Sequence, residues 1–378
     1  MKRKLIVQKY GSSCLHSPKD ILKVAQKISE DYKERRLLPI VVVSAMGETT
    51  DELLRLAHEV ASTPPPRELD MLLSVGERVS MALLSMALNE LQCPAISLTG
   101  SQAGILTDGT HNDAQIIATR PLRIDQALQE EKIVILAGFQ GVNPHTKEIT
   151  TLGRGGSDTT AIAIACHYHC PCEIFKDTQG IGSLDPRWEM PTTYYSQLSF
   201  EVLEKMCFWG AKILHHKGVK LAQKHKASLY IKPFSNRSIS TPRQGTLIVP
   251  AEKLFQHPLF KSPKPLALTL LENVFETSSP PQDPSCKTLL SHPEGSFIVS
   301  APKPLESPAQ TLLSVIFSQP LKEEDKITYH KKILSVLPND HLLLFSPYAL
   351  HILTPPSELK PTLSLVHTLF FVKANKFF

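Results

Sequence analysis

The decapeptide TLGRGGSDTT, residues 151–160, brings glycines together with an arginine and an aspartate. Its three glycines permit positive φ angles or a close backbone approach. They are Gly153, Gly155 and Gly156. Arg154 offers a planar fork for a carboxylate or phosphate, and Asp158 opens an apolar run, 158–168, that predicts a buried helix. A structural turn rarely needs these residues together, and a helix N-terminus favours anions, so we interpret the stretch as part of a ligand site.

Apolar runs and helical patterns alternate on both sides of this stretch. Strands are predicted at 4–10, 40–45, 132–139 and 172–177. Helices are predicted from Pro18, from about Glu48, and at 67–92, 158–168, 199–208 and 216–226. Apolar strands separated by helices predict a mainly parallel sheet covered on both faces, and ligands of such sheets bind at the carboxyl ends of the strands.

The composition is that of an ordinary globular protein and argues against several classes. Of 378 residues, 42% are apolar and 20% charged, and the formal charge of +5 comes without a dense Lys/Arg run, which argues against nucleic acid binding. The N-terminus lacks the apolar core of a signal peptide, and no run approaches the roughly 18 apolar residues of a membrane span. Seven cysteines without an export signal predict thiols in a reducing, cytoplasmic compartment.

The composition changes near residue 250, which predicts two domains, 1–250 and 251–378. The first part holds 16 of the 17 glycines, as expected of an α/β enzyme with glycine-rich turns. The second part holds one glycine and 16 prolines, and its apolar runs are broken at 278–285 and 300–308. These breaks predict irregular connections and leave the order of 280–310 open.

The first strand ends in a loop that suits a phosphate. Lys9 stands at the strand end, and Gly11 follows with the hydroxyl residues Ser12 and Ser13. Bare backbone N–H groups, hydroxyl donors and a fixed cation are the components of such a site. A plain strand–helix turn accounts for the same residues.

Two further candidates come from the second strand and the helix after it. Ser44 ends the strand and could place a hydroxyl at the same rim, or cap the next helix. Glu77 stands beside Gly76 in an apolar helical stretch. A surface position is the default for a glutamate, and an ammonium-binding carboxylate is the alternative.

The segment 175–187 follows another strand and could wrap a nucleotide, and Lys212 lies on a short turn before a helix. The chain contains no G-x-x-x-x-G-K-[ST] loop, and no G-x-G-x-x-G lies between a strand and a helix, which argues against a P-loop or dinucleotide site. CHYHCPC, residues 166–172, has zinc-ligand residue types, but it straddles a predicted helix end and lacks a second ligand pair.

Seven segments within residues 4–250 occur in the order seen in a known enzyme family. They are VQKYGSSC, VVVSAMG, SVGERVS, LAGFQGV, TTLGRGGSDTTA, CEIFKDTQGIGSLDPR and GAKILHHKGV. With them the chain resembles aspartate kinases. The resemblance implies a three-layer αβα sandwich of the amino-acid kinase type with a mainly parallel central sheet, followed by a smaller, degenerate ACT-like α+β region. It also implies phosphorylation of the β-carboxylate of L-aspartate with MgATP, the first step toward lysine (through diaminopimelate), threonine and methionine.

The resemblance implies a role for each matching side chain. Lys9 and Lys212 would bracket the transferring phosphoryl group, and Asp158 would orient both lysines. Aspartate would contact Ser44, Glu77, Arg154 and Ser157. ATP would contact Lys9, Tyr10, Gly11, Ser12, Ser13, Lys176, Asp177, Gly182, Ser183, Asp185, Arg187 and Lys212. Mg²⁺ would bridge phosphates with mostly water ligands, so no protein metal site is expected. A lysine or threonine effector and a homo-oligomer are further implications.

The chain departs from the family pattern at several positions. Ser12 replaces a usual glycine, Lys176 a usual threonine and Gly182 a usual tyrosine. We expect these departures to affect nucleotide binding. The C-terminal region lacks the glycine turns usual in ACT helices, which predicts a lost or altered effector site.

Two other functions stay open at this point. One is a kinase of the same superfamily acting on acetylglutamate, glutamate or a nucleotide monophosphate. The other is a non-catalytic regulatory binder that keeps the fold. Glu77 together with 153–158 favours an acceptor with both ammonium and carboxylate groups, and the retained lysines favour an enzyme over a binder.

Overall fold

The computed structural model describes residues 3–234, 245–254, 265–277, 287–291, 297–300, 309–337 and 341–372. The chain divides into two compact units. The first comprises 1–181, 194–198 and 214–250, and the second comprises 182–193, 199–213 and 251–378. The chain passes for the last time from the first unit to the second at residue 250, where the composition changes. The assignment of the two parts as catalytic and regulatory domains stays a prediction.

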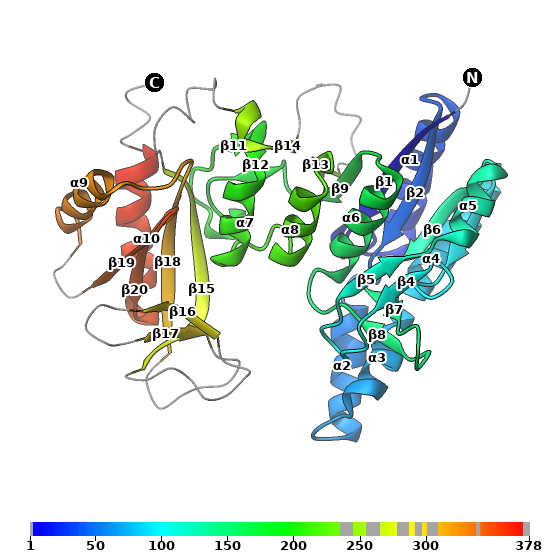
Figure 1. The fold of residues 1–378 in the computed structure, drawn as a ribbon, viewed down its shortest axis with the longest axis horizontal. Helices are drawn as coiled ribbons and strands as arrows, with labels where there is room; N and C mark the ends of the chain where they lie inside the picture. The colour runs from blue at the N-terminus through cyan, green and yellow to red at the C-terminus, as the bar shows by residue number, and fades with distance from the viewer. Residues whose placement is uncertain are drawn as a thin grey trace. The chain divides into compact units, whose positions relative to one another are not determined.

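An eight-stranded sheet forms the centre of the first unit (Figure 1). Six strands run parallel in the order β13 (Leu229–Pro233), β9 (Cys172–Lys176), β1 (Lys4–Tyr10), β2 (Leu37–Val43), β6 (Ile133–Ala137) and β3 (Ala95–Leu98). β14 (Thr246–Val249) pairs antiparallel with β13 and is followed at the edge by β12 (Gln197–Ser199). The predicted mainly parallel sheet is therefore confirmed.

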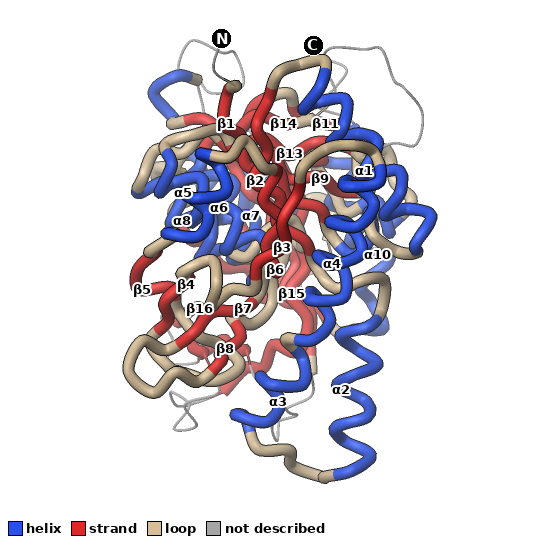
Figure 2. The backbone as a smooth tube through the Cα atoms, turned by 90° about the vertical axis from the view of Figure 1, so that its right-hand side faces the viewer, coloured by secondary structure: helices blue, strands red, loops and turns tan. Residues whose placement is uncertain are grey.

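Helices cover both faces of this sheet (Figure 2). α1 (Pro18–Lys33) and α4 (Val75–Glu90) lie on one side of the strands. α5 (Leu122–Gln129), α6 (Gly156–Tyr168) and α8 (His216–Lys224) lie on the other side. β1, β2 and β6 are buried on both faces, so they pack side chains against both helix layers. The three-layer αβα sandwich is confirmed.

The predicted helix at 67–92 is two helices, α3 (Pro66–Leu73) and α4, which meet at Ser74. By length and composition alone, the combined stretch Pro66–Glu90 passes as a membrane span, which the sequence patterns did not suggest. Such a result is weak, because core helices of soluble proteins pass the same test. Here α4 packs on α1 and on the central sheet, as a core helix does. α2 (Thr49–Val60) precedes this pair.

A second, four-stranded sheet in the first unit was not predicted. Its order is β5 (Ile116–Thr119), β4 (Ile105–Thr107), β7 (Gln140–Val142) and β8 (Ile149–Thr151). The strands have three or four residues each, too short for a clear periodic pattern. β7 and β8 pair antiparallel, and β8 leads directly into the turn before α6.

The second unit is a smaller α+β structure. Its six-stranded sheet has the order β16 (Lys287–Ser291), β17 (Phe297–Ser300), β15 (Pro265–Thr277), β18 (Gln310–Phe317), β20 (Ala349–Thr354) and β19 (Leu342–Ser346). Neighbouring strands are antiparallel. Its helices are α7 (Phe200–Phe208), α9 (Glu323–Leu334) and α10 (Leu359–His367). An ACT-like identity stays a prediction, and much of 280–310 lies outside the described residues.

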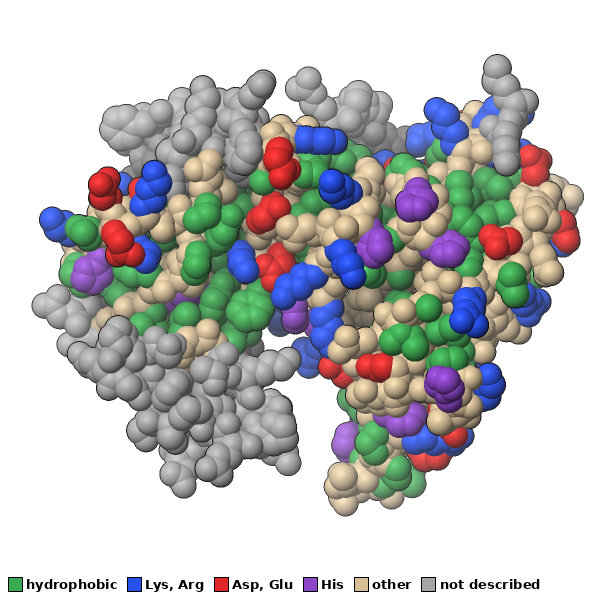
Figure 3. Space-filling model, in the orientation of Figure 1, with side chains coloured by type: hydrophobic (Ala, Val, Ile, Leu, Met, Phe, Trp, Pro, Cys, Tyr) green, Lys and Arg blue, Asp and Glu red, His purple; other side chains and the backbone are tan. Residues whose placement is uncertain are grey.

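Charged side chains of both signs are mixed on the described part of the face shown in Figure 3. On that face no stretch of one sign stands out among these residues, in keeping with the mild net charge of +5. The charges that matter for a ligand must therefore be sought in local, buried clusters.

Candidate active site

Lys9 and Asp158 form a buried ion pair at the carboxyl end of β1. Asp158 lies in the first turn of α6, the helix that packs against β1. Lys9 Nζ is 2.7 Å from Asp158 Oδ1, and the two side chains are 7% and 6% exposed. Burying both charges is expensive, and such a pair rarely adds net stability. A functional role is the better explanation for its place at the strand ends.

Lys176 contacts the second oxygen of the same carboxylate. It ends β9, the strand beside β1, and its Nζ lies 3.5 Å from Asp158 Oδ2. Burial of the Asp158 carboxyl raises its pKa, but the ammonium groups of Lys176 and Lys9 outweigh burial and hold the pKa below its usual range. Asp158 therefore stays ionised between two cations. We call Lys9, Asp158 and Lys176 the strand-end cluster.

The predicted glycines shape the turn before Asp158. Gly153 and Gly155 have φ angles of 71° and 69°, which favour glycine. A Cβ on Gly155 would lie 2.7 Å from the Cβ of His215, so a side chain there would also clash. The turn leaves Arg154 exposed, without a hydrogen bond or ion pair to a described residue. The guanidinium is thus available to a ligand.

Asp70 of α3 braces this turn, and sequence patterns missed it. Its fully buried carboxylate accepts hydrogen bonds from the Thr151 hydroxyl at 2.5 Å and from the Asn112 N–H at 3.1 Å. His111 Nδ1 lies 2.6 Å from its other oxygen. Thr151 ends β8 just before the glycine turn, so Asp70 fixes the strand end from which the turn with Arg154 begins. The sequence around Asp70 gives no indication of this, because an isolated acid on a helix is usually a surface residue.

Glu77 is buried, so the default surface assignment was wrong. Only 3% of the residue is exposed, and one carboxylate oxygen accepts a hydrogen bond from the Ala45 N–H at 3.0 Å. The approach of α4 needs Gly76, since a Cβ there would lie 2.8 Å from the Cβ of Ala45.

The other Glu77 oxygen, Oε2, has no hydrogen-bond partner among the described residues. Burial raises the pKa of Glu77 to about 7, although the Ala45 N–H and the charge of Lys9 lower it. A buried carboxylate oxygen without a partner, close enough to the strand-end cluster to interact with Lys9, suits a cationic ligand group.

The two predicted serines lie at neighbouring strand ends. Ser44 follows β2, is partly exposed, and donates its N–H to the Tyr10 carbonyl at 3.1 Å. Ser157 is buried at the start of α6, close to Gly138 after β6. A Cβ on Gly138 would lie 2.8 Å from that of Ser157, so this glycine lets α6 approach the sheet.

The loop after β1 fits a phosphate chain in its backbone and hydroxyl groups. A Cβ on Gly11 would lie 3.5 Å from Lys9 Nζ, so bare backbone borders the ammonium group. Ser12 and Ser13 are exposed in the 3₁₀ turn Ser12–Cys14. Tyr10 is different, because its ring is fully buried and stacks on Phe175 with centroids 4.7 Å apart. Its ring is therefore not available to a nucleotide, and the implied ATP contact of Tyr10 stays a prediction that concerns its backbone.

The remaining nucleotide candidates divide between the units. Asp177 is exposed directly after β9 in the first unit. In the second unit, Ser183 is buried and its hydroxyl accepts the Thr193 N–H at 3.0 Å, next to Gly182 in β10 (Ile181–Gly182). Asp185 binds Arg187 at 2.6 Å, and this pair together with the charge of Lys212 keeps the pKa of Asp185 low, against burial.

Lys212 is exposed on the predicted turn before α8. It belongs to the second unit, so its proposed convergence with Lys9 stays a prediction. Within the first unit, Lys176 is the lysine that contacts Asp158 beside Lys9, a contact that the resemblance did not imply.

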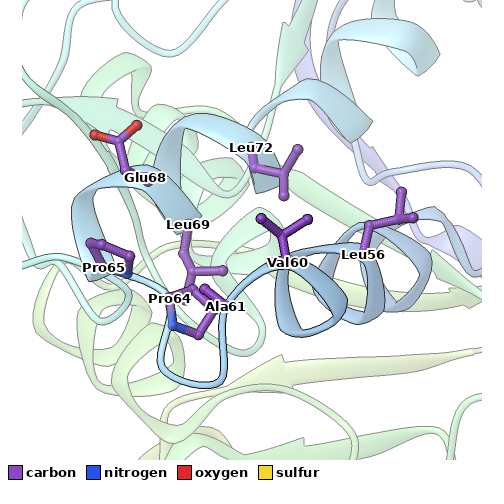
Figure 4. A pocket seen from close by; sticks show the side chains of 9 residues that line it. Leu56, Val60, Ala61, Pro64, Pro65, Glu68, Leu69 and Leu72 are labelled. Atoms are coloured by element: carbon purple, nitrogen blue, oxygen red, sulfur yellow. The ribbon is translucent and has the colours of Figure 1, made fainter.

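No group of three or more His, Cys, Asp or Glu side chains among the described residues forms a candidate metal site, CHYHCPC included. An apolar pocket of about 410 Å³ lies between α2 and α3 (Figure 4). Its lining includes Leu56, Val60, Leu69 and Leu72, with Glu68 as its charged residue. It contains none of the predicted site residues and offers no cation for a phosphate or carboxylate.

Comparisons with known proteins show the family to which the chain belongs. The amino acid kinase family model matches residues 4–233. The aspartokinase of Mycobacterium tuberculosis is 47% identical over 246 residues, which are 65% of this chain and 57% of that protein. The aspartokinase of Corynebacterium glutamicum is 46% identical over 245 residues, with the same coverage. This chain thus matches less than two thirds of the length of these curated relatives.

Among solved structures, E. coli aspartokinase III in complex with aspartate and ADP superimposes with a TM-score of 0.77 and covers 97% of this chain and 100% of that one. At 19% identity, this likeness concerns the fold alone.

Proposed function

This chain belongs to the amino acid kinase family, and we propose that it is an aspartate kinase. It would transfer the γ-phosphoryl group of MgATP to the β-carboxylate of L-aspartate, giving 4-phospho-L-aspartate and ADP. The observation that carries the proposal is the buried Glu77 carboxylate, whose Oε2 lacks a described partner, close to the Lys9–Asp158 pair. Glu77 would thus receive an ammonium group beside cations that suit a phosphate. The curated relatives named aspartokinase support the same substrate.

The charge of each site residue determines which group of the substrates it would bind. Glu77 would pair with the substrate ammonium group, and Arg154 with a carboxylate, while Ser44 and Ser157 border the same strand ends. Lys9 would offset the charge that develops on the transferring group, with Gly11, Ser12 and Ser13 donating to phosphate oxygens. Asp158 would orient Lys9 and not act as a base, because the attacking carboxylate has no proton to lose. Mg²⁺, when bound, would neutralise and orient the phosphates with mostly water ligands.

The second unit would supply further nucleotide contacts and any effector site. Ser183, Asp185, Arg187 and Lys212 would line the nucleotide site, and the C-terminal region would hold any lysine or threonine effector site that survives. We also propose a homo-oligomer in the cytoplasm. Seven cysteines that would remain thiols fit a reducing compartment.

A coupled assay for ADP release tests the proposal. The full chain is supplied with MgATP and, in separate reactions, with L-aspartate, acetylglutamate and glutamate. We expect ADP release that depends on L-aspartate. Release with acetylglutamate or glutamate instead would assign a different acceptor within the family. Binding of ATP without turnover on any acceptor would favour the non-catalytic alternative.

A further inference from the structure

We propose that Lys176 is a second phosphate-binding cation, acting with Lys9 on the polyphosphate chain of the nucleotide. The inference rests on the proposed function and deepens it, because it assigns a phosphate contact to a lysine that stands where the family pattern has a threonine. It also means that the first unit alone carries two cations for the phosphates. Four features of the structure support it.

The register of the sheet puts both lysines on one face. Lys9 in β1 is opposite Ile174 in β9, and Lys176 follows Ile174 by two residues. Since side chains alternate along a strand, Lys9 and Lys176 project toward the same side. That side carries α6 with Asp158, while Tyr10 and Phe175 stack on the opposite side. Both ammonium groups therefore reach the carboxyl end of the parallel strands on a single face.

The charges of the strand-end cluster do not balance. Two ammonium groups share one carboxylate, and Lys9 already meets it at 2.7 Å. The Lys176 contact is longer, at 3.5 Å, and its side chain is 22% exposed. An ammonium group has three donors, so Lys176 keeps donors for a ligand that approaches from solvent. Neutralising Asp158 does not require a second lysine.

The other charged groups nearby do not cancel this excess. Glu77 lies close enough to interact with Lys9, but burial raises its pKa to about 7, so it is only partly ionised near neutral pH. Asp177 follows Lys176 directly, but its side chain is exposed and forms no ion pair with Lys9 or Lys176 in the described part of the chain. A ligand with several negative charges is the natural complement of this arrangement.

The surroundings favour phosphates over a second carboxylate. Gly11 presents bare backbone beside Lys9, and the hydroxyl residues Ser12 and Ser13 are exposed on the same loop. The N-terminus of α6, thirteen residues long, lies at the cluster through Asp158 and adds a favourable potential for anions. These donors are numerous enough for a polyphosphate.

Nucleotide binding to the full chain tests the inference without relying on turnover. Lys176→Met is compared with Lys232→Met by calorimetric titration with ATP, ADP and adenosine. Lys232 is the matched control, because it lies on the adjacent strand β13, is 27% exposed, and pairs with Glu173 on the opposite face of the sheet. Both variants remove one charge from a strand end.

We expect Lys176→Met to weaken ATP and ADP about 10- to 100-fold, the usual effect of losing a charge-assisted hydrogen bond. Adenosine affinity should stay within about twofold, because the nucleoside carries no phosphate. Lys232→Met should leave the affinities for ATP, ADP and adenosine unchanged. Lys176→Arg should recover most of the ADP affinity, because it restores the charge. If Lys176→Met does not fold, Lys176→Gln, which keeps a hydrogen-bond donor for Asp158, replaces it.

Equal loss of ATP, ADP and adenosine affinity, or unchanged affinity for all three, would overturn the inference. The first result would mark Lys176 as a residue that maintains the fold, and the second as a surface cation. The proposed function fails separately, if the chain releases no ADP with L-aspartate. In that case selective loss of ADP affinity in Lys176→Met would still establish the phosphate contact.

Discussion

The strand-end cluster of the first unit and the loop 182–187 of the second hold their charges in opposite ways. In the cluster, Lys9, Asp158 and Lys176 come from three separate elements, and the Lys9–Asp158 pair is almost fully buried. In the loop, Asp185 pairs with Arg187 two residues later, and the Arg187 side chain is 66% exposed. The first arrangement exists only in the folded protein, whereas the second is encoded within one short segment.

This difference in burial determines how much each ion pair contributes to the stability of the folded protein. An exposed ion pair contributes about 0–1 kcal/mol, because water and salt screen it. A buried pair that loses one partner leaves an uncompensated charge, which costs about 3–5 kcal/mol. Substitutions in the cluster should therefore affect function and stability far more than those in the loop.

The largest effect is expected from Lys9. Replacing it with methionine should lower kcat about 100- to 1,000-fold, the usual loss when a group that stabilises transition-state charge is removed. The KM for aspartate should change much less, because Lys9 is assigned to the phosphoryl group. Steady-state kinetics with Lys23→Met as control, a partly exposed lysine of α1 that pairs with Asp20, would check this. Equal turnover of Lys9→Met and parent would remove Lys9 from the mechanism.

The second largest effect is expected from Glu77, whose contribution to aspartate binding should depend on pH. Its ionised form is needed to pair with the substrate ammonium group, and its pKa is raised to about 7. The apparent affinity for aspartate should therefore rise as the pH increases through 7. Glu77→Gln should weaken aspartate about 10- to 100-fold and abolish this rise. A parent protein with a KM independent of pH between 6 and 8 would contradict the assignment.

Glu77 should also make stability depend on pH. Its pKa is raised from 4.5 to about 7 in the folded state, so the folded protein binds more protons than the unfolded chain between these values. The free energy of unfolding should fall by about 3 kcal/mol as the pH rises through this window and level off above it. Denaturant unfolding at several pH values measures the decline, which Glu77→Gln should flatten.

A smaller effect is expected from Asp70, which braces the turn without being assigned to a ligand. Asp70→Asn places a donor against existing donors, so stability should fall by about 1–3 kcal/mol. The aspartate KM should rise less than in Arg154→Ala, because the guanidinium is misplaced and not removed. Asp51→Asn on the exposed side of α2 is the control. An aspartate KM equal to that of the parent would limit Asp70 to a structural role.

The smallest effect on stability is expected from Arg187 in the loop 182–187. Arg187→Ala should change the free energy of unfolding by less than about 1 kcal/mol, since the Arg187 side chain of the pair is 66% exposed and water screens its charge. Urea unfolding of this variant beside Lys9→Met tests the comparison directly. A loss of more than about 2 kcal/mol would show that the loop is as tightly integrated as the cluster.

Local patterns accounted for much of the first unit. The apolar run at 4–10 and the glycine turn before Asp158 were found where they were predicted, because both depend on neighbouring residues. The three- and four-residue strands of the second sheet were missed, since they are too short to show a period. Asp70 was missed because its partners, Thr151 and His111, are distant in the sequence.

The sequence alone determined the parallel α/β layering and identified Lys9, Glu77, Arg154 and Asp158 as candidates, because periodicity and turn chemistry act over a few residues. Only the tertiary structure decided which charges meet. The register between β1 and β9 brings Lys176 onto Asp158, and the packing of α4 against Ala45 buries Glu77. Burial and pairing between distant segments set the pKa and the free energy of each charged group, and neither can be read from spacing along the chain.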